Sequence, residues 1–477
     1  MYDCIIIGSG ISGATIAREL SKLNLKTIIL EKDFDVSGEA TMANSAIVHS
    51  GHDPLPGSLK AKYNVLGNRM YRQMSQELDI PLLECGGMVV ATDEEQLATI
   101  GELYERAFEN GLTESEVKLM TREEALVLEP SLSDQVIGAL NLPTTAVTFP
   151  WEAAIANIEN AMDNGVSLSV ETMVTGISKK DHFTVETTKG DFEGRVVINA
   201  SGIYASKIAS LLYEPEFNIR PRRGEYLVID SDTTVVNSVI YPTPTSKGKG
   251  VILTPQTHGE TLVGPTSEFV DFSEAMKTTA EGVKYVKENA VKTVKNIPFH
   301  KVIRSFAGAR PTGDTGDFII GESKIEGFIN VAGIESPGLT AAPAIALDIA
   351  SLVKDRLNAS DNTEYNPKRR KVIRINELNS EELSTLIKKD KAYGNVICRC
   401  EGITEGEIVD SIHRNCGSNT VVGVKARVRP GAGRCQGGFC QPEVLKILAR
   451  ELQLDPMDVL YKGRGSNILV AKTKDVE

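Results

Sequence analysis

The first 31 residues contain the feature that most restricts the fold of this chain. An apolar, β-branched run is followed by Gly8, Gly10 and Gly13 in the spacing G-x-G-x-x-G, by a helix-like segment, and by a second strand-like run that ends at Glu31. Gly8 permits a tight turn, Gly10 lets the backbone approach a pyrophosphate, and Gly13 lets the helix pack closely on the strand. The pattern predicts a βαβ unit that binds a dinucleotide, with the phosphates at the helix N-terminus and a ribose at Glu31.

The dinucleotide is expected to be FAD. The fingerprint alone does not separate FAD from NAD, but the chain contains no second fingerprint with its own strand and acidic partner. With a single dinucleotide site, a flavin that keeps its electrons bound is favoured over a nicotinamide that is released. The electrons must then leave by another route.

Composition bounds the class of protein. The chain has 477 residues, 41% hydrophobic and 24% charged, which is typical of a globular protein of two or three domains. Its net charge of −12 argues against nucleic-acid binding as the primary function. No apolar run reaches the roughly 20 residues that cross a bilayer, and the N-terminus lacks the pattern of a secretory signal. We expect a cytoplasmic protein, with peripheral attachment at the inner membrane face left open.

The cysteines cluster near the C-terminal end. Cys398-x-Cys400 and Cys435-x4-Cys440 form two pairs, and Cys416 lies between them. In a cytosolic chain, clustered cysteines are more often metal ligands than disulfides. Four paired thiolates suit either a [2Fe–2S] cluster or a structural zinc ion, and both alternatives stay open on this evidence. Cys416 is expected to be a structural residue.

Other stretches resemble the D-amino-acid oxidase-like family of FAD enzymes over most of residues 1–355. The stretches that carry this resemblance are 43–51, 56–62, 197–202, 222–226, 264–266, 308–311 and 333–340. Within the family, they are similar to the glycerol-3-phosphate dehydrogenase and oxidase group, including the anaerobic catalytic subunit and the type II enzymes, and to the L-2-hydroxyglutarate dehydrogenase group. The segments 398–401 and 433–440 resemble the bacterioferritin-associated ferredoxin-like domain, which implies a [2Fe–2S] cluster on the four paired cysteines.

The resemblance implies an α/β fold with a Rossmann-like, GR2-type FAD domain, a β-rich substrate cap and a small, mostly α-helical C-terminal iron–sulfur domain. The expected divisions are an oxidoreductase at 1–355, a linker at 356–392 and a [2Fe–2S]-binding domain at 393–477. Within the first part, FAD-binding segments are expected at about 1–80, 145–215 and 305–355, and cap segments at about 81–144 and 216–304.

Three residues are expected to act on the substrate. An imidazole titrates near neutral pH, so His49 could take the proton from a substrate hydroxyl while hydride leaves the same carbon. His52 is the competing base, and His258 is a more distant one. In the family, an arginine at the position of Arg310 commonly holds the substrate's anionic group, although a guanidinium suits carboxylate and phosphate equally. Ser336 is expected to contact substrate or flavin.

Twelve residues are expected to contact FAD. Their types suit it: glycines allow close backbone approach, and small polar side chains can contact the ribityl chain or the flavin edge. A helix that begins near Leu339 could direct its N-terminus at the flavin pyrimidine ring. The expected cofactor contacts are Gly8, Gly10, Gly13, Glu31, Asn44, Ser45, Ala200, Gly202, Gly333, Gly338, Leu339 and Thr340.

The leading expectation for function is an FAD-dependent dehydrogenase that oxidises sn-glycerol 3-phosphate to dihydroxyacetone phosphate. The resemblance implies hydride transfer to flavin N5, with electrons passing to a partner flavoprotein or to quinone. The alternatives are an L-2-hydroxyglutarate dehydrogenase or oxidase, and a non-catalytic electron-transfer subunit that binds FAD and an iron–sulfur cluster. For both enzyme alternatives the small substrate is an anionic hydroxy compound, and no nucleic acid is expected as a partner.

Overall fold

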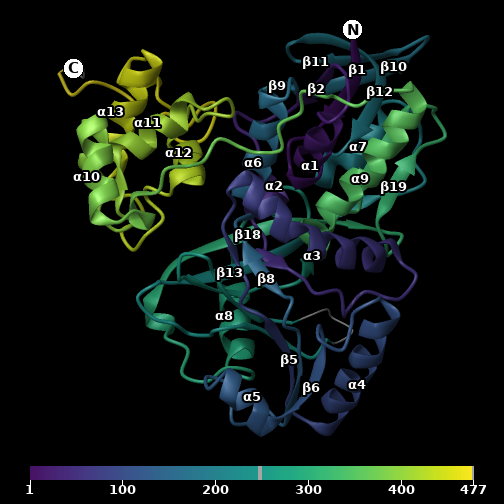
Figure 1. The fold of residues 1–477 in the computed structure, drawn as a ribbon, viewed down its shortest axis with the longest axis vertical. Coiled ribbons are helices and arrows are strands. Elements are labelled where there is room, and N and C mark those ends of the chain that lie inside the picture. Colours follow the sequence, from purple (N-terminus) through teal and green to yellow (C-terminus); the bar gives the residue numbers. More distant parts are fainter. Residues whose placement is uncertain (245–249, 475–477) are drawn as a thin grey trace.

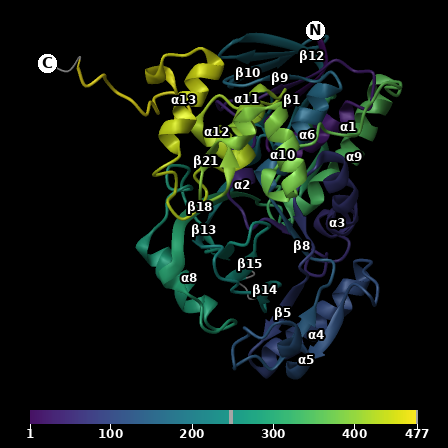
Figure 2. The same cartoon turned by 60° about the vertical axis from the view of Figure 1, so that its left-hand side comes forward.

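The structure is a computed structural model that describes residues 1–244 and 250–474. It has three parts, shown in Figure 1: a nucleotide domain around one large sheet, a cap around a second sheet, and a C-terminal module of short helices. The cap lies at one end of the nucleotide domain, and the C-terminal module lies at its side. Turning the molecule brings α11 (Glu405–His413), α12 (Val421–Val428) and α13 (Gln441–Leu452) of the module to the front, beside the cap strands β13 (Ile219–Ile229) and β18 (Val302–Gly313) (Figure 2).

The nucleotide domain is built on an eight-stranded sheet. Its parallel centre has the order β20-β12-β1-β2-β9, and β10, β11 and β19 are antiparallel additions. The strands are β1 Tyr2–Ile7, β2 Thr27–Leu30, β9 Ser167–Ser169, β10 Val174–Lys179, β11 Phe183–Thr187, β12 Gly190–Asn199, β19 Ile319–Glu322 and β20 Phe328–Ala332. Because β1 pairs with both β2 and β12 in parallel, the carboxyl ends of these strands share one edge, where Gly8, Glu31 and Ala200 follow them.

The two faces of β1 carry different layers because successive side chains point to opposite sides of a strand. Cys4 and Ile6 belong to a buried cluster formed with helices α1 (Ile11–Leu20), α3 (Leu59–Leu78), α6 (Pro150–Asp163) and α9 (Gly338–Leu357). Ile5 and Ile7 pack instead with β10, β11 and α7 (Ala205–Ser210). Each fully buried isoleucine contributes about 1.5–3 kcal/mol, so this alternation fixes both layers on the sheet.

The cap is built on a nine-stranded sheet drawn from two separate chain segments. The order is β17-β13-β16-β15-β14-β5-β7-β6, with β18 also paired to β13. Its strands are β5 Gly87–Ala91, β6 Lys118–Thr121, β7 Gly138–Asn141, β13 Ile219–Ile229, β14 Val239–Pro242, β15 Ile252–Pro255, β16 Thr261–Gly264, β17 Glu268–Phe269 and β18 Val302–Gly313. Its helices are α4 Glu94–Glu109, α5 Arg122–Leu128 and α8 Ala280–Ala290.

Two features join the cap to the nucleotide domain. The first is a small sheet in which β8 (Ala146–Thr148) pairs with β3 (Ile47–Val48) and β4 (Leu82–Leu83). The second is the long antiparallel pair of β13 and β18. At Gly308 on β18, a Cβ atom would lie 1.9 Å from the carbonyl oxygen of Ala43, which follows the short helix α2 (Glu39–Met42). Only glycine allows this approach, so β18 lies directly against the segment that precedes β3.

The C-terminal module has a small core of its own. A hairpin of β21 (Val396–Cys398) and β22 (Ile403–Thr404) precedes α11 (Glu405–His413), α12 (Val421–Val428) and α13 (Gln441–Leu452). Apolar residues of all three helices form one buried cluster. The stretch expected as a linker contains α10 (Ser380–Lys389), which has an Asn379 capping box and no fully buried residue.

Ion pairs attach the module to both other parts. To the nucleotide domain these pairs are Arg427 with Asp35 at 2.8 Å and Arg414 with Glu159 at 2.7 Å. To the cap they are Arg434 with Asp230 and Asp232, both at 2.6 Å, and Arg429 with Glu260. The module is therefore held against two bodies that also meet each other.

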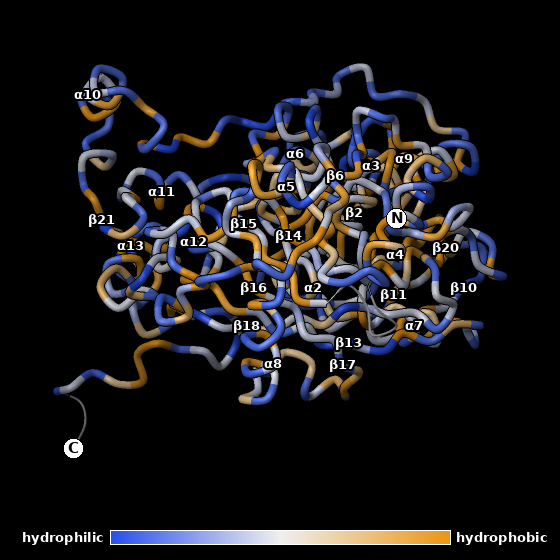
Figure 3. The backbone as a smooth tube through the Cα atoms, turned by 90° about the horizontal axis from the view of Figure 1, so that it is seen from below, coloured by the Kyte–Doolittle hydropathy of each residue, from blue (hydrophilic) through white to orange (hydrophobic). Residues whose placement is uncertain are grey.

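Apolar residues gather inside the molecule, as the hydropathy colouring of Figure 3 shows for the strands of both sheets. The α10 segment projects away from that interior. Across residues 1–244 and 250–474, no helix combines the length and apolar character needed to span a bilayer.

Candidate active site

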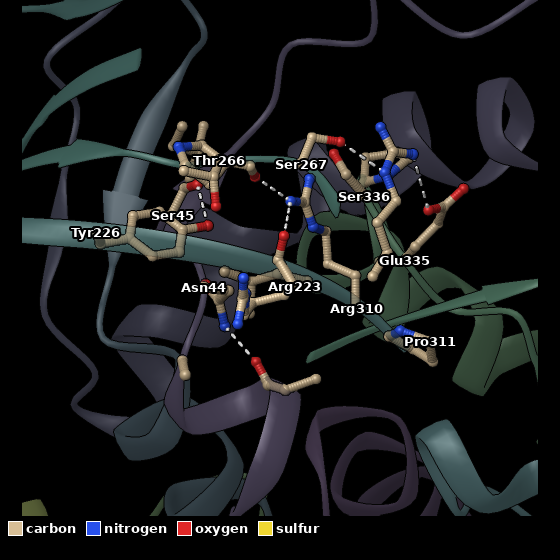
Figure 4. A pocket seen from close by; sticks show the side chains of 18 of the residues that line it. Asn44, Ser45, Arg223, Tyr226, Thr266, Ser267, Arg310, Pro311, Glu335 and Ser336 are labelled. Carbon is tan, nitrogen blue, oxygen red and sulfur yellow. Dashed lines mark hydrogen bonds and ion pairs between the residues drawn. The ribbon is translucent and has the colours of Figure 1, made fainter. Parts of the chain in front are cut away.

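A cavity of about 1310 Å³ lies between the nucleotide domain and the cap. Small-molecule sites usually measure roughly 300–1,000 Å³, so this one has room for a dinucleotide and a small substrate together. Helices α1 and α9 of the nucleotide domain open into it with their N-termini, and β13 and β18 of the cap contribute side chains opposite them. Figure 4 shows part of this wall.

The α1 end of the cavity fits a pyrophosphate. Gly8 has φ +103°, and a Cβ there would lie 2.7 Å from the carbonyl oxygen of Ala200. A Cβ on Gly13 would lie 2.0 Å from the carbonyl oxygen of Gly8, so both positions require glycine. Gly10 lines the cavity and precedes α1 without any side-chain cap. The helix begins at Ile11, and Gly13 therefore lies within its first turn.

Glu31 lies beside this turn and does not line the cavity. Its carboxylate accepts hydrogen bonds from the Ser9 backbone N–H at 3.0 Å, the Ser9 hydroxyl at 2.5 Å and the Asp33 N–H at 2.9 Å. Burial raises the pKa of Glu31 above its ordinary value. The side chain thus braces the glycine turn at the end of β2, next to the place predicted for a ribose.

The middle of the cavity brings together Asn44, Ser45, Ala200 and Gly202, which all line it. Asn44 is fixed by its amide, which donates to the carbonyl oxygens of Ala40 and Thr41 at 3.0 Å. The Ser45 hydroxyl lies 3.1 Å from the Tyr226 hydroxyl, so it links this loop to the cap strand β13.

Of the four cofactor contacts expected near the start of α9, two line the cavity and two do not. Gly338 and Leu339 line the cavity, and no side chain caps this helix start. Gly333, at φ +66°, and Thr340 do not line it. Thr340 is fully buried and holds β3 instead: its Oγ1 accepts the His49 backbone N–H at 2.9 Å and lies 3.4 Å from the Ile47 carbonyl oxygen.

His49 is the one histidine among the three candidate bases that lines the cavity. Its Nε2 is 3.5 Å from the Ser336 hydroxyl oxygen, and its Nδ1 is 3.3 Å from the Tyr241 hydroxyl oxygen. His52 is buried and its Nδ1 lies 3.0 Å from the Ser50 hydroxyl oxygen. The ring of His258 contacts Phe149 at 4.8 Å between centroids, away from the cavity lining. Geometry therefore favours His49 over both competitors.

Arg310, on β18, lines the same cavity as His49. Its Nη2 donates to the carbonyl oxygens of Thr266 at 2.6 Å and Arg223 at 3.3 Å, as Figure 4 shows. Its Nε has no hydrogen-bond partner among the described residues although it is buried. Burial lowers the pKa of Arg310. A desolvated guanidinium with an unsatisfied N–H suits an anionic ligand.

Glu335 and Ser336 lie next to each other on the loop before α9 and both line the cavity. The Glu335 carboxylate is held by Lys60 at 2.9 Å and by the Thr312 hydroxyl at 2.8 Å. Arg222 lies 3.9 Å from the same carboxylate. Glu335 thus places a negative charge close to Lys60 and Arg222 at this part of the cavity.

Tyr241 and Glu335 escaped the sequence-based prediction of the site. Tyr241 is 192 positions from His49 and lies in the other domain, so no local spacing connects the two. Glu335 precedes Ser336 directly, within a stretch that carries the family resemblance, and its charge was the available signal.

The four paired cysteines form a second site in the C-terminal module. The Sγ atoms of Cys400 and Cys435 are 3.7 Å apart. A hydrogen bond from the Cys440 thiol lowers the pKa of Cys398 below its ordinary value. Cys398 and Cys440 are buried, while Cys400 is exposed. The thiols therefore lie as two neighbouring pairs, one inside the module and one at its surface.

The four thiols agree in number and pairing with the ligands of the expected cluster. Within the described parts of the chain, no three His, Cys, Asp or Glu side chains converge as ligands of a single metal ion. A [2Fe–2S] cluster takes four cysteines, two on each iron, which agrees with two thiol pairs. A Cβ on Gly433 would lie 2.6 Å from the Cβ of Cys400, so glycine is needed beside the ligand loop. The donor set fits the cluster.

Comparison with known proteins finds a matching family for each of the two parts of the chain that contain these sites. The family described as FAD dependent oxidoreductase matches residues 3–352, and the BFD-like [2Fe-2S] binding domain matches residues 396–450. A glycerol 3-phosphate dehydrogenase of Caloramator mitchellensis is 44% identical over 478 residues, covering 99% of each chain.

Two further relatives cover less of the chain. An L-2-hydroxyglutarate dehydrogenase of Escherichia coli is 32% identical over 277 residues, 56% of this chain and 64% of its own. The structure of an FAD-bound L-alpha-glycerophosphate oxidase from Mycoplasma pneumoniae has a TM-score of 0.74 and 31% identity, covering 77% of this chain and 98% of its own. The full-length likeness is thus to an enzyme of glycerol 3-phosphate.

Proposed function

Because the chain belongs to the family of FAD-dependent oxidoreductases, we propose that it oxidises sn-glycerol 3-phosphate to dihydroxyacetone phosphate. The observation that carries the proposal is the cavity lining, which contains the neighbouring His49 and Ser336 together with the desolvated Arg310. This lining offers a base for a hydroxyl and a cation for an anionic group within one site. The relative that matches the whole chain acts on glycerol 3-phosphate.

The cofactors supply the redox chemistry: FAD, when bound, accepts a hydride from the carbinol carbon, and a [2Fe–2S] cluster carries single electrons. The chain's own residues then have three tasks. They bind the dinucleotide at Gly8, Gly10 and the start of α1, they orient the substrate, and they remove its hydroxyl proton. Cys398, Cys400, Cys435 and Cys440 would hold the cluster.

Substrate orientation is assigned to the cap side. Arg310 donates its unsatisfied N–H groups to the phosphate, and Arg222 adds a second positive charge near it. Arg223 is engaged by Glu268 at 2.6 Å and Glu225 at 3.3 Å, so it supports the strand instead of the ligand. In this proposal the phosphate lies against β13 and β18, and the carbinol carbon points toward the nucleotide domain.

Proton removal is assigned to His49. Its Nε2 faces the space beside Ser336, where the substrate hydroxyl would lie, and takes the hydroxyl proton as hydride leaves the carbon. The Ser336 hydroxyl can hold that substrate oxygen in place. Backbone N–H groups at the start of α9 face the same cavity and stabilise negative charge that develops there.

The electron acceptor is part of the proposal. We infer that a partner flavoprotein or quinone receives the electrons. The module that matches a [2Fe-2S] binding domain supports this assignment, because its Cys400 lies at the protein surface.

Anaerobic reduction of the flavin tests the substrate. The holoenzyme is mixed with sn-glycerol 3-phosphate or with L-2-hydroxyglutarate, and the flavin absorbance is followed. We expect rapid bleaching with glycerol 3-phosphate only. Bleaching with L-2-hydroxyglutarate alone would establish the hydroxyacid alternative, and an oxidised flavin with every substrate would establish a non-catalytic subunit.

Replacing His49 tests the base. His49→Gln should lower the rate of flavin reduction by about 10²–10⁴-fold, the usual contribution of general base catalysis, while flavin content stays the same. His52→Gln is the matched control, since His52 does not line the cavity. An unchanged rate in His49→Gln together with a large loss in His52→Gln would transfer the role to His52.

A further inference from the structure

The two ring nitrogens of His49 have different neighbours. Nδ1 lies 3.3 Å from the hydroxyl oxygen of Tyr241, and Nε2 lies 3.5 Å from that of Ser336 beside the cavity. The His49 and Tyr241 rings are 5.9 Å apart between centroids, with 36° between their planes. One nitrogen therefore contacts the cap, and the other serves the reaction space.

The backbone of His49 is fixed from both sides. Its N–H donates to Thr340 Oγ1 at 2.9 Å, and its carbonyl oxygen accepts the Asn68 side-chain amide at 3.0 Å. These bonds come from α9 and α3 of the nucleotide domain. The position of the His49 backbone is thus fixed. The ring nitrogen that carries the proton is then set by the hydrogen bonds of the ring, including the one at Nδ1.

Tyr241 is a rigid partner. It lies on β14, is paired in register with Val89 of β5, and is only 2% exposed. A Cβ on Gly87 would lie 3.1 Å from both Tyr241 Cε2 and Thr145 Oγ1, so glycine leaves room for both side chains, and Thr145 Oγ1 is buried without a hydrogen-bond partner among the described residues. Burial raises the pKa of Tyr241 well above its ordinary value, so the phenol stays protonated.

We propose that Tyr241 is a positioning residue that sets the tautomer of His49. In this arrangement Nδ1 of His49 carries the proton and donates it in a hydrogen bond to the Tyr241 hydroxyl oxygen, while the phenol turns its own proton toward Thr145. The Nε2 lone pair then faces Ser336 and can take the substrate proton. The inference rests on the proposed function, because it assumes that His49 is the base.

The opposite arrangement makes a different prediction. If the Tyr241 hydroxyl donated to Nδ1, then Nε2 would carry the proton and His49 could only donate to the substrate. Other titratable groups face this region: His52 and Asp53 from the loop after His49, Cys85 beside Tyr241, Glu335 beside Ser336, and Arg310 from β18. All of them remain in a Tyr241 variant, so they do not account for a difference from the parent.

Nitrogen NMR of ¹⁵N-histidine-labelled holoenzyme measures the tautomer directly. The chain has 6 histidines, and His49→Gln identifies the signals of His49. We expect the parent protein to carry the proton on Nδ1, and Tyr241→Phe to lose this preference. Thr145→Val should weaken it without removing the phenol. Because this readout needs no substrate, it can fail or succeed independently of the substrate assignment.

The pH dependence gives the second readout. The Tyr241 oxygen stabilises protonated His49 more than the neutral ring, so Tyr241→Phe lowers the pKa of the base. We expect the acid limb of kcat/KM to move to lower pH by about 0.5–1 unit, and kcat to fall about 2- to 10-fold, the effect of one hydrogen bond. A merely structural role would not move the limb.

Tyr71→Phe is the matched control, since Tyr71 is also buried and donates its hydroxyl to the Leu339 carbonyl oxygen at 2.7 Å. It should leave the His49 tautomer and the acid limb unchanged. A proton on Nε2 in the parent protein would overturn the proposal even if Tyr241→Phe did not fold. An unshifted acid limb with an unchanged tautomer in Tyr241→Phe would overturn it as well.

Discussion

Arg310 combines rigid support with unsatisfied hydrogen-bonding capacity. Two carbonyl oxygens hold its Nη2, and its buried Nε has no partner among the described residues. Lysine keeps the charge but loses the planar fork that binds two phosphate oxygens at once. Arg310→Lys should therefore raise KM for glycerol 3-phosphate by about 10- to 100-fold, corresponding to one charge-assisted hydrogen bond. Steady-state kinetics with an artificial acceptor measure this change.

The control for Arg310 lies on the same strand. Arg304 is exposed on β18, six positions away, and does not line the cavity. Arg304→Lys should leave KM unchanged. If Arg310→Lys also kept the parental KM at constant flavin content, the anionic group would have to bind elsewhere, and Arg222 would be the next candidate.

Residues that act within one turn could be predicted from the sequence, and residues that meet across domains could not. Gly8 and Gly13 are close in the chain, and their roles follow from one turn geometry. His49 and Ser336 were predicted separately, but their contact joins positions 287 apart. Thr340 was expected at the cofactor, yet its hydroxyl satisfies β3 of the same domain. Periodicity gives no information about such tertiary contacts.

Helix α6 anchors the C-terminal part through Glu152, which pairs with Arg374, and through the more deeply buried Glu159. Glu159 is 3% exposed and pairs with Arg369 at 2.9 Å and Arg414 at 2.7 Å, each also 3% exposed. Removing one partner of a buried ion pair costs about 3–5 kcal/mol, because the remaining charges stay buried without compensation. Glu159→Gln should lower stability by that amount. The fluorescence of Trp151 reports it during denaturant unfolding, since Trp151 lies in the first turn of the same helix.

Glu288→Gln is a suitable comparison for Glu159→Gln. The Glu288 side chain is 61% exposed and lies 3.8 Å from Lys284 on α8. Exposed pairs contribute about 0–1 kcal/mol, so this variant should behave like the parent. Equal midpoints for Glu159→Gln and Glu288→Gln would show that the buried cluster does not stabilise the attachment.

His258, in the turn between β15 and β16, should make the attachment of the C-terminal part sensitive to acid. Burial and the nearby guanidinium groups of Arg429 and Arg374 lower the pKa of His258 to about 3. A released or unfolded histidine titrates near 6.5, so the folded state binds fewer protons between these values. The contribution of neutral His258 to the stability is therefore fully present above pH 6.5 and is lost as the pH falls toward 3.

The acid effect can be read at the same tryptophan. The Trp151 ring is 4.8 Å from Phe149, on which His258 packs at the same distance. We expect the unfolding midpoint to fall between pH 7 and pH 5 in the parent, and to fall less in His258→Phe, which keeps the ring contact. Because part of the His258 side chain is exposed, solvent screening limits the difference to under about 1 kcal/mol. Identical pH dependence in both proteins would exclude His258 as its source.

At the scale of the whole molecule, strands that pair in space can lie far apart in the sequence. The N-terminal βαβ unit could be predicted because β1, α1 and β2 are consecutive. The cap could not be assembled from the sequence alone: β14 pairs with β5 in parallel, although more than a hundred residues and a return through the nucleotide domain separate them. Hydrophobic alternation indicates strands but carries no information about which strands pair.

Loss of the cluster should weaken the ion pairs between the C-terminal module and the cap, because one loop contributes to both. Residues 429–440 contain Cys435 and Cys440 as well as the arginines that pair with Glu260, Asp230 and Asp232 of the cap. Metal binding contributes folding free energy to small metal-binding modules. Cys435→Ser with Cys440→Ser should therefore melt the module at lower temperature and expose residues 358–395 to proteolysis.

The flavin domain should survive this change, because the residues that line the cavity all lie before position 340. Calorimetry, flavin content, iron and acid-labile sulfide are measured together. Cys416→Ser is the control, since Cys416 is buried beside Arg427 and away from the thiol pairs. We expect sulfide and iron in the parent and in Cys416→Ser, and neither in the double variant. Zinc without sulfide in the parent would show that the four cysteines hold a structural zinc ion and no cluster. An unchanged melting temperature of the module in the double variant would show that its attachment to the cap does not depend on the metal.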